Sequence, residues 1–299
     1  MSYSLVLEDV NKSFAGKQAV RDLSLAIPEG SIYGFLGPNG AGKTTTIRMI
    51  MSIIRPDSGR IELLSSTSPL SVKDRLGYLP EEKGLYKKMK TRELIAYFGR
   101  LKHMQKDVAL RRADEVLEQF GLGEQRHARC DTLSKGMGQK VQILATLLHD
   151  PDFVILDEPF SGLDPINIEL VRQLILDLKA SGKTVIFSTH IMEQAEQLCD
   201  YVLLINGGQK LIDGPLDEVR RTAEPTLTVE IDGEPPSLEI EGVSRVNNMG
   251  RRLELSLAND ADPQAILSSL MQATTLRSFA IKEPSLHEIF VRTVGSSPE

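Results

Sequence analysis

The sequence has 299 residues with a net charge of −6, and its 41 % hydrophobic and 25 % charged residues are ordinary for a globular chain of roughly two domains. The negative charge gives no basis for nucleic-acid binding, and no stretch has the roughly 18–20 apolar residues of a transmembrane helix or the pattern of a secretion signal. Two cysteines, Cys130 and Cys199, are too few for a disulfide framework, so we expect a cytosolic, two-domain protein.

The first part of the chain alternates short apolar runs with longer helical segments, a pattern typical of βαβ units. The loosely alternating segment Leu5–Ala26 predicts a small antiparallel sheet. The apolar runs Ile32–Leu36, Phe153–Leu156 and Thr184–Ser188 suit strands covered on both faces of a parallel sheet. Residues 82–149, dense in Lys, Arg, Glu and Leu, predict a mostly helical subdomain.

A change in composition then marks a smaller second domain. Thr226–Ile231 and Arg252–Leu257 alternate like half-buried strands, and a helix is expected over residues 263–271. Ser285 and Glu288 have capping-box spacing and predict the start of a short terminal helix. We therefore predict two domains: an α/β domain over residues 1–220 and a small α+β domain over residues 221–299.

A phosphate-binding loop follows the first predicted buried strand. Its sequence fits G-x-x-x-x-G-K-[ST] and reads Gly37-Pro38-Asn39-Gly40-Ala41-Gly42-Lys43-Thr44. The glycines let successive backbone N–H groups turn inward towards phosphates, and the helix that begins near Lys43 points its positive end at them. Lys43 would neutralise the β- and γ-phosphates, the Thr44 hydroxyl would ligate Mg²⁺, and Thr45 completes the predicted set.

Polar residues also end the two later buried strands. Asp157 and Glu158 follow Phe153–Leu156, and His190 follows Thr184–Ser188. Because the carboxyl ends of parallel strands meet at the sheet edge that carries the phosphate loop, we expect these side chains to reach the nucleotide. Asp157 suits Mg²⁺ binding, Glu158 suits polarisation of an attacking water, and His190 suits a γ-phosphate oxygen and that water.

In order and spacing, these segments resemble the ATP-binding subunits of ABC transporters. Residues 37–44 and 153–158 resemble Walker A and Walker B, residues 161–164 resemble the D-loop that ends in Asp164, and His190 resembles the H-loop residue. Residues 133–137 resemble the signature motif.

The resemblance implies roles for further residues. Ser134 and Gly136 of the signature would contact the γ-phosphate of ATP bound to the opposite subunit, and Phe14 would stack on adenine. Glu81 occupies the position of the Q-loop glutamine, where a carboxylate would ligate Mg²⁺ and add negative charge. Lys135 replaces a signature glycine and Met137 replaces the signature glutamine.

The resemblance also implies a fold, cofactors and partners. The expected fold is a P-loop ABC cassette with a mostly parallel sheet core, a small antiparallel β subdomain and a helical subdomain, followed by the C-terminal domain of a subgroup that includes sodium-extrusion and antibiotic-export ATPases. We expect ATP and Mg²⁺ as cofactors. The expected partners are membrane-spanning permease subunits and a second ATP-binding subunit, identical or related, and the expected location is peripheral at the cytoplasmic face of the membrane.

Two other classes of function have to be weighed. A soluble ABC ATPase of translation would carry two cassettes, whereas one Walker A is present, and one of cofactor assembly typically lacks the C-terminal domain. A nucleotide sensor without turnover would need neither Glu158 nor His190. The leading hypothesis is an ATPase that energises export through a separate permease.

Overall fold

The computed structural model describes residues 2–81, 84, 86–221, 226–232, 241–258, 261–282 and 284–295. The chain divides into two compact units, Met1–Asp213 and Gly214–Glu299. The larger unit contains two sheets and the smaller unit one, and each unit has its own apolar core.

Six strands form the central sheet of the larger unit: β3 (Ile32–Leu36), β5 (Leu76–Leu79), β6 (Phe153–Asp157), β7 (Thr184–Thr189), β8 (Tyr201–Asn206) and β9 (Gln209–Pro215). Their order is β5-β6-β7-β3-β8-β9, and the pairs from β5 to β8 are parallel. Every residue of β3, β6 and β7 is buried, as the apolar runs predict. Gly207-Gly208, both with positive φ, joins β8 to β9 in a two-residue turn that suits an antiparallel hairpin.

A second sheet of the larger unit is antiparallel. Its strands are β1 (Tyr3–Phe14), β2 (Lys17–Pro28) and β4 (Ser58–Leu63), in the order β2-β1-β4. Leu5 and Ile27 of this sheet share one core cluster with Tyr33 and Ile155 of the central sheet. The structure thus confirms the predicted antiparallel subdomain, to which β4 is an addition.

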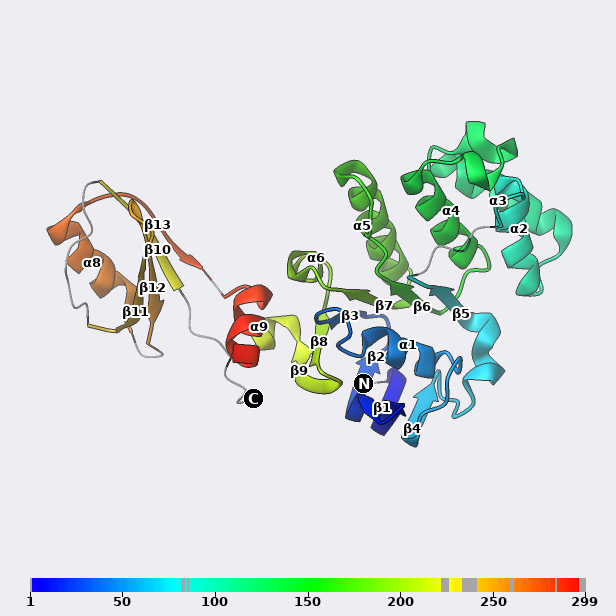
Figure 1. Cartoon of the computed structure of the whole chain (residues 1–299). Coiled ribbons are helices and arrows are strands. Elements are labelled where there is room, and N and C mark those ends of the chain that lie inside the picture. The colour runs from blue at the N-terminus through cyan, green and yellow to red at the C-terminus, as the bar shows by residue number, and fades with distance from the viewer. Residues whose placement is uncertain are drawn as a thin grey trace. The chain divides into compact units, whose positions relative to one another are not determined.

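The helices of the larger unit form two sets. The first comprises α1 (Lys43–Ile50), α5 (Pro165–Ala180), α6 (Met192–Glu196) and a 3-10 helix (Pro69–Arg75). The second comprises α2 (Thr91–Leu101), α3 (Lys106–Gln119), α4 (Lys135–Leu147) and the 3-10 helices Gly123–His127 and Cys130–Thr132. The second set has its own core, which includes Leu94, Ala113 and Val141. Figure 1 shows α2, α3 and α4 on the side of the central sheet opposite to β1, β2 and β4.

The smaller unit contains the elements α7 (Leu216–Arg221), β10 (Thr226–Asp232), β11 (Val243–Asn248), β12 (Arg252–Leu257), α8 (Pro263–Ala273), β13 (Thr275–Lys282) and α9 (Leu286–Gly295). Its sheet is antiparallel with the order β11-β12-β10-β13, and α8 contributes Ile266 and Leu270 to its core. At the start of α9, Ser285 N donates to Glu288 Oε2 over 2.7 Å, and Glu288 N donates to Ser285 Oγ over 3.2 Å. The predicted capping box is therefore present.

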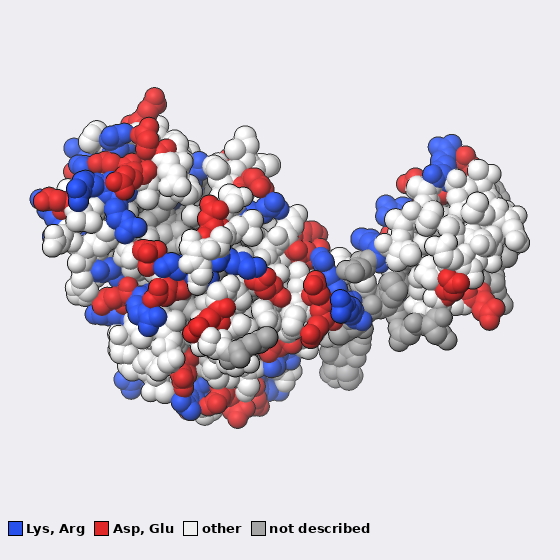
Figure 2. All heavy atoms as spheres, turned by 180° about the vertical axis from the view of Figure 1, so that it is seen from behind, with Lys and Arg blue, Asp and Glu red and all other residues white. Residues whose placement is uncertain are grey.

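The surface of the larger unit has mixed charge. On the face shown in Figure 2, basic and acidic side chains are interspersed, so the coloured atoms do not gather into a broad field of one sign. Among the helices within the described ranges, none combines the length and the apolar character needed to cross a bilayer.

We predict that a fragment of residues 1–221 folds by itself, because the core clusters described above for the larger unit and the whole of β9 lie within it. Calorimetry should place its unfolding midpoint within roughly 4 °C of the corresponding transition of the full chain, the shift that about 1 kcal/mol produces at this size. A fragment that ends at residue 205 lacks β9 and serves as the destabilised control. An unfolded 1–221 fragment would contradict the independence of the larger unit.

Candidate nucleotide-binding site

The phosphate loop joins β3 to α1 and is packed against neighbouring backbone. Gly37 has a φ of 150°, and a Cβ there would lie 2.1 Å from the carbonyl oxygen of Ile205. Gly42 has a φ of 111°, and its Cβ would lie 2.6 Å from the carbonyl oxygen of Ala19. Any other residue at either position would clash with backbone that cannot move aside, so both glycines are required for the loop to hold its shape.

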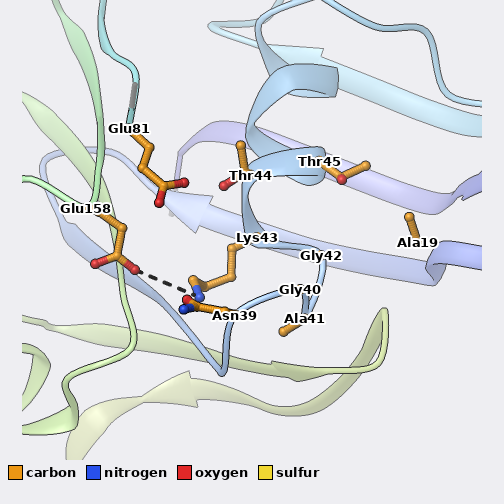
Figure 3. Close-up of a pocket in the computed structure, with 10 residues that line it drawn as sticks. All are labelled: Ala19, Asn39, Gly40, Ala41, Gly42, Lys43, Thr44, Thr45, Glu81 and Glu158. Atoms are coloured by element: carbon orange, nitrogen blue, oxygen red, sulfur yellow. Dashed lines mark ion pairs between the residues drawn. The ribbon is translucent and has the colours of Figure 1, made fainter. Parts of the chain in front are cut away.

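The loop encloses one side of a cavity of about 380 Å³, drawn in Figure 3. The residues that line it are Ala19, Asn39, Gly40, Ala41, Gly42, Lys43, Thr44, Thr45, Glu81 and Glu158. Sequence reasoning selected all of them except Ala19, a small side chain of β2 that carries no recognisable signal. Gly37 and Pro38 lie at the base of the loop and do not line the cavity.

Lys43 is the buried cation of this site, with only 6 % of its side chain exposed. Its Nζ donates to the carbonyl oxygens of Gly37 at 2.6 Å and Pro38 at 3.1 Å, and lies 4.0 Å from Glu158 Oε1. Burial lowers the pKa of Lys43, while the carboxylates of Glu158, Asp157 and Glu81 act in the opposite direction. The ammonium group thus donates hydrogen bonds to its own loop and lies within the electrostatic influence of these three carboxylates.

Asp157 lies at the end of β6 and is 1 % exposed. Its Oδ1 accepts a hydrogen bond from Ser188 Oγ at 2.5 Å and lies 3.5 Å from Thr44 Oγ1. Its Oδ2 is buried and has no hydrogen-bond partner among the residues that the structure describes. A buried, unsatisfied carboxylate oxygen beside a threonine hydroxyl fits a hard divalent cation and its bound water.

Within the part of the chain that the structure describes, no group of three or more His, Cys, Asp and Glu side chains is arranged to hold an ion. Glu81 lines the same cavity as Thr44, and both side chains point into it in Figure 3. Oxygen ligands of this kind suit a hard divalent cation, which also binds water and phosphate oxygens.

Glu158 combines an unusual backbone with a buried carboxylate. Its φ is 50°, in the left-handed region that few residues other than glycine adopt, and its side chain is 10 % exposed. The N–H of Glu158 donates to Ser188 Oγ at 3.0 Å, and Oε1 lies 3.0 Å from His190 Nδ1. Ser188 thus holds both acidic residues, and this contact between strands was not predicted from the sequence.

Phe14, the predicted adenine-stacking residue, does not line the cavity. It ends β1, is 48 % exposed, and has Lys12 Nζ 5.4 Å from the centroid of its ring. Its ring is therefore accessible on the surface, as stacking on a planar ligand requires.

The signature and D-loop residues also lie away from the cavity, and they contact each other through Asn167. Ser134 is the N-cap of α4, Asp164 is the N-cap of α5, and neither lines the cavity. Asn167 donates to both Asp164 oxygens, which lowers the pKa of Asp164, and a Cβ at Gly136 would lie 3.3 Å from Asn167 Nδ2. The starts of α4 and α5 therefore form one continuous surface.

Comparisons with known proteins identify the family to which the chain belongs. Residues 20–161 match the ABC transporter family, and residues 214–294 match the family described as ATP-binding protein DrrA1-3-like, C-terminal domain. The chain is 38 % identical over 294 residues to the uncharacterized ABC transporter ATP-binding protein YhaQ of Bacillus subtilis. The aligned region covers 98 % of this chain and 99 % of that protein. It is 33 % identical over 300 residues to the Nod factor export ATP-binding protein I of Rhizobium leguminosarum bv. viciae, with coverages of 98 % and 95 %.

Among solved structures, an ATP-binding subunit of an ABC transporter aligns with a TM-score of 0.68 at 29 % identity, over 74 % of this chain and 93 % of that chain. The similarity to these two relatives extends over nearly the whole length of this chain and of each relative. The similar solved structure is also an ATP-binding subunit of an ABC transporter. The chain therefore belongs to the family of ATP-binding subunits of ABC transporters.

Proposed function

We propose that this chain binds Mg-ATP at the phosphate loop and hydrolyses it with Glu158 as the residue that polarises the attacking water. The observation that carries the proposal is the position of Glu158, whose carboxylate contacts His190 at the rim of the cavity that Lys43 also lines. Hydrolysis by the family's ATP-binding subunits energises transport.

The shape of the cavity supports one orientation of ATP. Ala19 lies at the end of the cavity away from Glu158 in Figure 3, so adenine would lie towards Ala19 and Phe14 and the γ-phosphate towards Glu158. The phosphates would then lie on the backbone of the loop at the N-terminus of α1. Lys43 would exchange its contacts with Gly37 and Pro38 for contacts with phosphate oxygens.

Asp157 and Thr44 would hold Mg²⁺, with Glu81 as an additional ligand from the same cavity. A bound Mg²⁺ would neutralise charge that develops on the phosphates. Asp157 would act through its free Oδ2, because Ser188 already occupies Oδ1. Ser188 would thereby fix the direction in which Asp157 points.

Glu158 would accept a proton from water, and His190 would keep its carboxylate in position. The left-handed backbone at Glu158 directs its side chain towards the cavity, and the hydrogen bond from its N–H to Ser188 fixes that backbone. Backbone strain of this kind is common where a side chain must be held ready for chemistry.

The site would be completed by a second copy of the chain or a related subunit. Ser134 and Gly136 do not line the cavity of their own chain, although the α4 N-terminus that they form can bind an anion. In a head-to-tail dimer, Ser134 and Gly136 of each copy would contact the ATP of the other. ATP would then act as a ligand that stabilises the dimer.

The permease would dock on the larger unit at the cytoplasmic face of the membrane. An apolar cavity of about 120 Å³ lies beside the end of β5, and Leu79, Leu94 and Phe98 are among its lining residues. Tyr86, 53 % exposed, has its ring 6.4 Å from that of Phe98 and belongs to the basic segment 83–90, of which residues 83 and 85 lie outside the described ranges. The exporter named among the relatives supports export as the direction of transport.

We predict that Glu158→Gln binds ATP normally but hydrolyses it about 10²–10⁴-fold more slowly, because an amide cannot accept the proton from water. Single-turnover hydrolysis and a nucleotide titration measure the two effects separately. Glu169→Gln, which removes an exposed carboxylate of α5, is the matched control. Turnover of Glu158→Gln at the rate of the control would show that another residue activates the water.

We predict that in Asp157→Asn the gain in ATP affinity on addition of Mg²⁺ is smaller by about tenfold or more than in the parent protein. The reason is that a contact with a charged group contributes roughly 1.5–3 kcal/mol. Calorimetric titrations with Mg²⁺ and with a chelator give the two affinities. Asp150→Asn removes an exposed carboxylate that pairs with Lys183 and should leave the Mg²⁺ effect unchanged. Equal Mg²⁺ effects in all three proteins would exclude Asp157 from the metal site.

We predict that Glu158→Gln sediments as a dimer with saturating Mg-ATP and as a monomer without nucleotide, because ATP would join the two surfaces. A second substitution, Ser134→Glu, places a negative charge opposite the γ-phosphate and should keep the protein monomeric under the same conditions. A monomer of Glu158→Gln with ATP bound would refute the head-to-tail site.

A further inference from the structure

The ATP site of this chain carries an excess of negative charge. The carboxylates of Asp157, Glu158 and Glu81 all interact electrostatically with the buried ammonium group of Lys43. Glu81 occupies the position at which the ABC transporter family usually has an uncharged glutamine. ATP adds further negative charge, and uncompensated charge is unfavourable in a partly buried site. A further cation beside Lys43 would offset part of this negative charge.

Lys135 is an unusual residue for its position. It is the first residue of α4, where the helix dipole favours anions, and the first turn of α4 contains no acidic residue. No hydrogen bond or ion pair joins its ammonium group to the residues that the structure describes. Lys135 is thus unfavourable at the start of this helix and has no partner there. A residue that breaks a local rule in this way indicates a functional role, here one outside its own chain.

The side chain of Lys135 lies across the D-loop. A Cβ at Gly162 would come within 2.4 Å of both Cε and Nζ of Lys135, so the absence of a side chain at Gly162 leaves room for this arrangement. Gly136, the next residue, packs against Asn167 of α5. The exposed Lys135 ammonium therefore lies on the surface that also carries Ser134 and Asp164.

We propose that Lys135 of one copy supplies the positive charge that offsets Glu81 in the ATP site of the other copy. This inference rests on the head-to-tail dimer of the proposed function, which brings α4 to the γ-phosphate of its partner. Lys135 would lie close to the Glu81 carboxylate and the γ-phosphate, where its positive charge reduces the repulsion between these two groups as charge moves onto the phosphate during hydrolysis. The two departures from the family pattern, one acidic and one basic, then form a single pair across the dimer.

A double-mutant cycle tests the pairing. Lys135→Met keeps the length of the side chain over Gly162, removes the charge, and should slow single-turnover hydrolysis about tenfold or more, the factor of one charged hydrogen bond. In a Glu81→Gln background the same substitution should slow hydrolysis less than about threefold, because the effects of substitutions at coupled residues are not additive.

Two further variants serve as controls for the cycle. Lys135→Arg keeps the charge and should retain most of the rate, and Lys140→Met removes a charge further along α4 as the matched control. Equal effects of Lys135→Met in both backgrounds would overturn the pairing.

Mixed dimers test whether Lys135 acts on the partner. In a mixture of Glu158→Gln and Lys135→Met chains, one composite site combines an intact Glu158 with an intact Lys135 from the other chain, so fast turnover should reappear. Mixing Lys135→Met with a chain that carries both substitutions provides no Lys135 and should give no recovery. Absence of recovery in the first mixture would show that Lys135 acts within its own chain.

Sedimentation separates failure of this inference from failure of the proposed function. If Glu158→Gln dimerises with ATP and Lys135→Met hydrolyses ATP at the parental rate, then the dimer stands and the role of Lys135 is refuted. If no dimer forms with ATP, then the head-to-tail site itself fails.

Discussion

The buried ammonium group of Lys43 is the charge around which the site is organised. A lysine that is 6 % exposed needs hydrogen-bond acceptors and opposite charge, and it obtains both from Gly37, Pro38 and Glu158. The carbonyl groups of the loop can reach Lys43 only because the loop folds back over it, with Gly37 and Gly42 pressed against other strands. The contacts of Lys43 with the loop carbonyls and the close packing of Gly37 and Gly42 therefore hold the phosphate loop in one shape.

Ser188 connects this centre to the chemistry. A single hydroxyl donates to Asp157 and accepts from the N–H of Glu158, so one buried side chain of β7 positions the two acidic residues of β6. Because Asp157 and Ser188 are paired directly across the parallel sheet, the register of two strands sets the position of both carboxylates. The positions of these two carboxylates thus depend on the pairing of β6 with β7.

The sequence predicts those features that depend on local pattern. The buried strand Ile32–Leu36, the strand Arg252–Leu257 and the capping box of Ser285 and Glu288 are all found as expected, because burial on both faces, alternation and capping have local signatures. The edge strands β11 and β13 have largely exposed side chains and gave no alternation to recognise. Ala19, the contacts of Ser188 and the position of Lys135 over Gly162 depend on segments far apart in sequence, which one-dimensional patterns do not relate.

The turn between β8 and β9 has a consequence for the order of events during synthesis. Gly208 N donates to Ala41 O, and Ile205 O lies against Gly37, so the phosphate loop depends on the last hairpin of the larger unit. A nascent chain that lacks Gly208 carries the loop sequence without these supports. At about 5–20 residues per second, several seconds or more of translation separate the appearance of the loop from that of its supports. The contacts that support the phosphate loop are therefore complete only when synthesis of the larger unit is nearly finished.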